Sequence, residues 1–125
     1  MTYKTTENNF MFFKSQCEFW QKILGLHSWK VYYEHTHCGQ VLADCSTNYS
    51  GRVATIRLNT KWTLQPTEDC LHETAIHEVL EIMLSPLLAQ AKSRVWDTEE
   101  YEKDHHAIIR VFERLLLNKL KNDKR

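Results

Sequence analysis

Three short β-type segments in the first half of the chain restrict its possible folds more than any other sequence feature. Residues 29–34 are aromatic and β-branched, residues 41–47 follow Gly39, and residues 53–59 alternate between apolar and polar side chains. The Asn-Tyr-Ser-Gly sequence at 48–51 is typical of a turn. Short strands that are joined by turns indicate an antiparallel meander, so a three-stranded antiparallel sheet is predicted.

One helix is predicted before these strands. Apolar side chains recur at helical spacing over residues 8–24, and Gly25 is a natural terminator because glycine adopts the left-handed conformation that ends many helices.

Two further helices are predicted after the strands. Thr67 can cap the free amides of a helix that starts beside it, and Pro86 is expected to kink or end that helix near Leu84. A last helix is predicted from Thr98 to about Leu120. The whole order predicts one α+β domain over residues 1–125, with helices covering one face of a small sheet.

Charge and composition narrow the classes of partner. Sixteen basic and sixteen acidic side chains cancel, a balance that does not favour nucleic acid as a partner. Residues 1–16 lack the features of a secretory signal, and no apolar run approaches the roughly 18 residues that a membrane span needs. The four cysteines form no C-x-x-C pair, which is typical of reduced thiols. We therefore expect a cytoplasmic protein without a nucleic-acid or membrane partner. The sequence does not indicate an oligomeric state.

The run HETAIHEVLEIML at residues 72–84 carries the main candidate for chemistry. His77 and Glu81 are four residues apart, so a helix places them on one face, and both side-chain types are accepted zinc ligands. Glu78 follows the first ligand directly, which is where a zinc protease has its general base. Both ligands lie at the edge of the apolar stripe, as expected for a groove between helix and sheet. The simpler interpretation is a solvated helix edge, and His72 is expected to cap or face solvent.

A third ligand is predicted on the final helix. His106 occupies a position on its helix like that of His77 and Glu81 on theirs, whereas His105 lies nearer the centre of the stripe, as a buried histidine would. The run His35-Thr36-His37-Cys38 is a competing cluster. On a strand its two histidines share a face while Cys38 points away, so it is the weaker candidate.

Five segments resemble those of a known family. They are LGLHSWKV at 24–31, LAD at 42–44, RVATIRL at 52–58, HEVLEIMLSPL at 77–87 and HAIIRVFE at 106–113. Their order and spacing are similar to those of small metallopeptidase-like proteins of phages and prophages, distant relatives of the SprT-like zincins. The family's metal helix carries H-E-x-x-H, whereas this chain has H-E-x-x-E, with Glu81 in the place of the second histidine.

The resemblance implies a zincin-like fold with one Zn²⁺ ion held by His77, Glu81 and His106. It also implies that Glu78 is the general base in the hydrolysis of peptide bonds by a metal-activated water. A glutamate ligand also suits other divalent metals, and its negative charge weakens the metal's effect on bound water.

Three functions stay open at this point. The first is a metallopeptidase that acts on a protein or peptide, in the host cytoplasm if the protein is phage-encoded. The second is a catalytically inactive zincin-like protein that binds a host protein, with or without metal, through exposed aromatic residues such as Tyr49, Trp62 and Trp96. The third is a metal-free structural domain.

Overall fold

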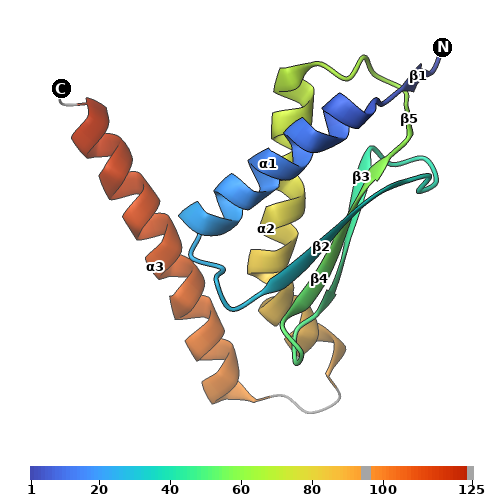
Figure 1. Cartoon of the computed structure of the whole chain (residues 1–125). Coiled ribbons are helices and arrows are strands. Elements are labelled where there is room, and N and C mark those ends of the chain that lie inside the picture. The colour runs from blue at the N-terminus through green and yellow to red at the C-terminus, as the bar shows by residue number, and fades with distance from the viewer. Residues whose placement is uncertain (94–96, 124–125) are drawn as a thin grey trace. The chain divides into compact units, whose positions relative to one another are not determined.

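The computed structural model describes residues 1–93 and 97–123 (Figure 1). It divides into two compact units, Met1–Ile82 and Met83–Arg125, and each is described by itself below. Helix α2 (Glu68–Lys92) contributes to both units. The predicted α+β class is confirmed, with three helices and two small sheets among the described residues.

Helix α1 (Glu7–Ile23) begins and ends at local sequence signals. The Thr6 hydroxyl accepts a hydrogen bond from the Asn9 amide at 3.0 Å, and the Asn9 side chain accepts one from the Thr6 amide at 2.8 Å. This capping box satisfies amides that have no partner within the helix. Gly25 has a φ of 71°, which ends the helix as predicted.

The main sheet contains β2 (Lys30–Thr36), β3 (Ala43–Asn48) and β4 (Val53–Asn59) in the order β2-β4-β3. Strands β3 and β4 are antiparallel, but β2 and β4 are parallel. The predicted antiparallel meander is therefore wrong. Ala54, Ile56 and Leu58 of β4 are at most 1% exposed. Strand β4 therefore occupies the centre of the sheet, where its apolar side chains are best buried. The more polar β2 and β3 form the edges.

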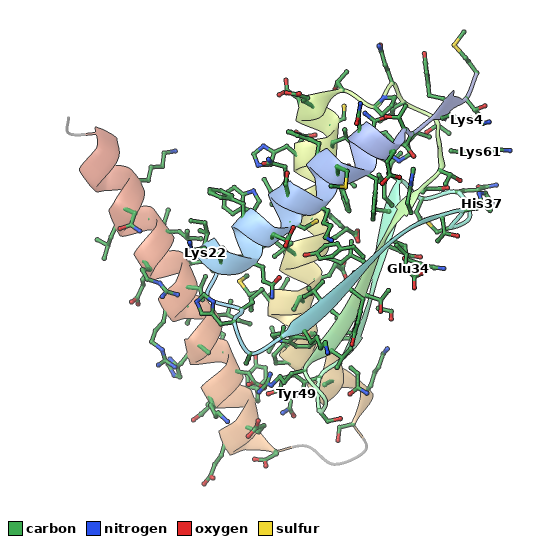
Figure 2. The ribbon with its side chains drawn as sticks, viewed as in Figure 1. Lys4, Lys22, Glu34, His37, Tyr49 and Lys61 are labelled. Atoms are coloured by element: carbon green, nitrogen blue, oxygen red, sulfur yellow. The ribbon has the colours of Figure 1, made fainter. Side chains whose placement is uncertain are left out.

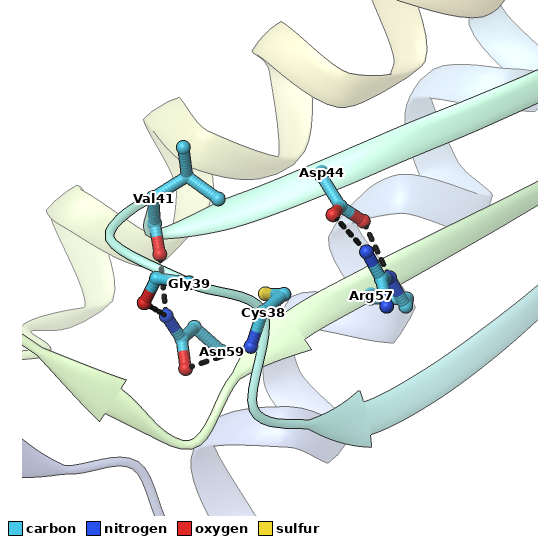
Figure 3. Close-up of polar contacts among 6 residues, drawn as sticks. All are labelled: Cys38, Gly39, Val41, Asp44, Arg57 and Asn59. Atoms are coloured by element: carbon cyan, nitrogen blue, oxygen red, sulfur yellow. Dashed lines mark hydrogen bonds and ion pairs between the residues drawn. The ribbon is translucent and has the colours of Figure 1, made fainter.

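The β2–β3 loop must cross the end of β4 to join the two edge strands (Figures 1 and 3). Asn59, the last residue of β4, is 1% exposed and holds this loop with its side-chain amide. Its nitrogen donates to the carbonyl oxygens of Gly39 at 3.1 Å and Val41 at 2.6 Å. Its oxygen accepts from the backbone amides of Cys38 at 3.3 Å and Lys61 at 3.1 Å. One buried side chain therefore fixes the crossing loop to the start of the next strand.

A second sheet pairs β1 (Tyr3–Lys4) with β5 (Lys61–Trp62), and the sequence analysis did not predict it. The expectation that Trp62 is exposed in a loop is wrong, because its side chain is 1% exposed. Its indole nitrogen donates to the Leu42 carbonyl oxygen at 2.9 Å. This hydrogen bond joins β5 to the end of the β2–β3 loop, in addition to the contacts of Asn59.

Helix α1 and the first part of α2 cover one face of the main sheet (Figure 1). Helix α2 begins as predicted, because the Thr67 hydroxyl accepts from the Cys70 amide at 3.2 Å. His72 was expected to cap or to face solvent, but it accepts a hydrogen bond from the Trp20 indole at 2.8 Å. The largest fully buried apolar side chains of this unit are those of Trp62, Phe13, Ile56, Leu58, Leu71, Ile82 and Val79.

The second unit contains the end of α2 and helix α3 (Thr98–Asp123). Pro86 is expected to kink or end the helix near Leu84; α2 continues through Pro86, so the helix does not end there. Proline removes one amide donor and crowds the preceding turn, but a long helix can bend around that defect. Helix α3 starts at Thr98 as predicted, and Trp96 lies outside the described residues. Among residues 1–93 and 97–123, no helix combines the length and apolar character of a membrane span.

Candidate functional site

His77 and Glu81 lie one turn apart on α2, and both side chains are exposed. The His77 Nε2 atom is 3.6 Å from the Glu81 Oε1 atom. The helix therefore places an imidazole nitrogen and a carboxylate oxygen close enough to share one cation, as the spacing predicts.

Glu78 differs from these neighbours because its side chain is buried. Only 4% of the residue is exposed, and its Oε2 atom has no hydrogen-bond partner among the described residues. Burial raises the pKa of Glu78 to about 7, and the negative charges of Glu81 and Asp44 contribute to the rise. A buried, unpaired carboxylate is unusual in a folded protein, so it requires an explanation.

A pocket of about 430 Å³ lies between α2 and the start of β3. It is lined by residues 40–43 on one side and by Glu73, Thr74, His77 and Glu78 on the other. A groove between helix and sheet was expected from the position of His77 on the helix, and the pocket lies at that place. Among the described residues strand β3 is an edge of the main sheet, and its first residue, Ala43, lines the pocket.

The surroundings of Glu78 are electronegative. Burial raises the pKa of the Cys45 thiol on β3 to about 12, and Glu78, Glu81 and Asp44 add to this rise in that order. Asp44 accepts a hydrogen bond from the Arg57 Nε atom at 2.8 Å, so that carboxylate has a cationic partner (Figure 3). Among the described residues Glu78 has no cationic partner, so its ionised form would attract a cation beside the pocket.

The donor atoms of His77 and Glu81 fit a zinc ion or another divalent metal, but they are only two ligands. Within residues 1–93 and 97–123, no three His, Cys, Asp or Glu side chains converge to hold a metal ion. His106 lies on α3 in the second unit and is exposed, and its role as third ligand stays a prediction. His105 was expected to be buried, but it is exposed and stacks on the Tyr101 ring.

The residues of the competing cluster, His35, His37 and Cys38, have separate surroundings in the structure. The His35 Nε2 atom is 2.7 Å from the Thr5 hydroxyl, and its ring stacks on Phe10, so this imidazole has structural partners. His37 is exposed and lines a second pocket. Cys38 is buried, and its backbone amide donates to Asn59.

Asn59 is the main site-positioning residue that the sequence analysis missed. It fixes the loop that lines the pocket of His77 and Glu78, although it does not line that pocket itself. One sequence signal was present: Asn59 directly follows Leu58, where the apolar alternation of the strand stops.

Comparisons of the chain with protein-family models, with curated proteins and with solved structures gave no match.

Proposed function

We propose that this protein is a metal-dependent, zinc-type peptidase-like protein in which Glu78 is the general base and His77 and Glu81 are metal ligands. The observation that supports this proposal best is the buried Glu78 carboxylate. It lines a pocket beside the exposed His77–Glu81 pair and has one oxygen without a partner. An unsatisfied buried polar group costs about 1–3 kcal/mol, so a purely structural role for Glu78 would be an expensive one.

The free edge of β3 supports a peptide as the substrate. An extended peptide can add to an exposed strand edge through backbone hydrogen bonds. Residues 40–43 lead into β3 and form one wall of the pocket. A peptide bound along this wall would have a carbonyl group within the pocket that Glu78 lines.

Each side chain has a separate role in the proposed chemistry. His77 and Glu81 would hold the ion, with His106 as the third ligand predicted from the sequence. Zinc, when bound, would supply Lewis-acid activation of water and of the substrate carbonyl. Glu78 would accept the proton from the attacking water and return it to the leaving amine. Residues 40–43 would position the peptide and exclude solvent.

A catalytically inactive binding protein is the second candidate function. It is favoured by the sequence H-E-x-x-E, because the negative charge of Glu81 in the place of the second histidine weakens the metal's effect on bound water. The same pocket and strand edge would then bind a segment of a host protein without cutting it.

Metal content and peptide cleavage separate the two functions. Protein purified without chelator is expected to carry about one equivalent of zinc by elemental analysis, and His77→Ala is expected to remove it. His106→Ala should also lower the zinc content if this residue is a ligand, with His105→Ala as the matched control.

Glu78→Gln tests the general base. We expect this variant to keep its zinc but to lose the cleavage of a peptide mixture, as followed by mass spectrometry. Glu73→Gln is the matched control, because Glu73 lines the same pocket and is exposed. Zinc without any cleavage by the unmutated protein would favour the binding function, and protein without zinc would refute the metal site.

A further inference from the structure

A second pocket, of about 310 Å³, lies beside the first and shares a wall with it. Residues 40–42 line both pockets. The second pocket is completed by His37 and Gly39 from the crossing loop and by Lys61, Trp62 and other residues around β5. The buried indole of Trp62 and the exposed side chains of Lys61 and His37 give it an apolar surface with a basic rim.

A further lysine, which does not line the second pocket, lies next to its basic rim. Lys4 of β1 lies directly opposite Lys61 of β5 in the antiparallel pair. Like charges at such positions repel each other and destabilise the pairing. Within the described part of the chain, neither lysine nor His37 takes part in an ion pair. Figure 2 shows all three residues at the same end of the first unit, whereas Lys22 lies at the far end of α1.

The basic rim is held at a fixed place relative to the first pocket. The Asn59 side chain binds the backbone of Lys61 and the carbonyl oxygens of Gly39 and Val41. The same buried amide therefore positions Lys61 and the wall that the two pockets share. The first pocket is acidic, with Glu73 and Glu78 in its lining, so the charge changes sign across residues 40–42.

We propose that the second pocket binds a carboxylate group of the peptide that occupies the first pocket. The carboxylate belongs either to an acidic side chain or to the C-terminus of the peptide, since Lys61, Lys4 and His37 would bind both in the same way. Assigning the carboxylate to a substrate rests on the proposed function, but binding of the anion does not. The consequence is a preference for acidic or carboxyl-terminal peptide segments.

Three short peptides distinguish the sources of the carboxylate. They are acetyl-Ala-Ala-Ala-amide, acetyl-Ala-Ala-Asp-amide and acetyl-Ala-Ala-Ala with a free C-terminus. Each is titrated into ¹⁵N-labelled full-length protein, and the amide signals of Gly39, Lys61 and Thr63 are followed by NMR. An exposed ion pair changes affinity by up to about fivefold. At least one carboxylate peptide is therefore expected to bind about three- to fivefold more tightly than the neutral one.

Lys61→Gln is expected to remove this difference, while Lys22→Gln, at an exposed lysine on α1, should leave it unchanged. Tighter binding of the aspartate peptide alone assigns the pocket to an acidic side chain, and tighter binding of the free C-terminus alone assigns it to a terminal carboxylate. Equal binding of all three peptides, or a preference that survives in Lys61→Gln, would overturn the inference. A carboxylate preference without any cleavage would refute the peptidase proposal but leave this pocket assigned.

Discussion

Replacing Glu78 by glutamine is predicted to affect the stability of the metal-free protein more favourably at high pH than at low pH. The pKa of Glu78 rises from its ordinary value of 4.5 to about 7 on folding. Between these two values the folded protein binds the proton and the unfolded chain does not, so stability falls as the pH increases. One pKa unit corresponds to about 1.4 kcal/mol, so ionisation of Glu78 costs about 3 kcal/mol once the pH is well above 7.

Glutamine removes the charge but keeps the shape of the side chain. Its buried amide has its own cost of about 1–3 kcal/mol, and that cost is the same at every pH. The diagnostic quantity is therefore the change in the mutational effect between pH 4 and pH 8.5. We expect Glu78→Gln to gain about 3 kcal/mol relative to the unmutated protein over this interval.

Urea unfolding in the presence of EDTA measures this quantity. Tryptophan fluorescence reports on the first unit, because Trp29 and Trp62 are buried there. With a slope of about 1–3 kcal/mol per molar urea, the midpoint difference between the two proteins should change by roughly 1–3 M. Glu73→Gln, at an exposed position of the same pocket, should show almost no change. A mutational effect of Glu78→Gln that is equal at both pH values would refute the assignment of a buried, unpaired carboxylate.

Three further predictions follow from other parts of the structure. Asn59→Ala should destabilise the protein by about 2–4 kcal/mol in the same urea assay, since it removes the partner of four backbone groups, of which the Cys38 amide makes a buried hydrogen bond. Asn48→Ala at an exposed turn should have a smaller effect, and equal effects would contradict the role of Asn59. In native protein at pH 8, iodoacetamide should label the partly exposed Cys70 well before Cys17, whose thiol is fully buried and has a raised pKa; equal labelling by mass spectrometry would show that the core opens readily. Glu81→His should tighten zinc binding in a competition titration, and an unchanged affinity would argue that Glu81 is not a ligand.

The helices could be predicted from the sequence because their signals are local. Gly25, Thr67 and Thr98 mark helix ends within one or two residues of the observed positions. The sequence alone did not distinguish an end from a kink at Pro86, because an interior proline can kink a helix as well as break it. The two-residue strands β1 and β5 are too short to leave a periodic pattern, and for that reason Trp62 was assigned to a loop.

Strand order could not be predicted in the same way. The hairpin of β3 and β4 follows from the turn at 48–51, but which side of β4 receives β2 depends on tertiary packing. For the candidate site, the spacing of His77 and Glu81 was readable because it depends on helix geometry alone. The burial of Glu78 without a partner depends on the neighbouring sheet, and Asn59 acts through a loop that is distant in sequence.

The crossing of the β2–β3 loop over the end of β4 also sets an order of assembly. Strands β3 and β4 are joined by a tight turn and can pair early, whereas β2 must wait for β4 because its partners lie beyond β3 in the sequence. The loop that Asn59 holds is therefore expected to close last. By the same reasoning it opens first in the native protein, so its amides should exchange with solvent deuterium through local opening. A peptide bound across both pockets would slow that exchange. Peptide binding would then stabilise the same loop that closes last in folding.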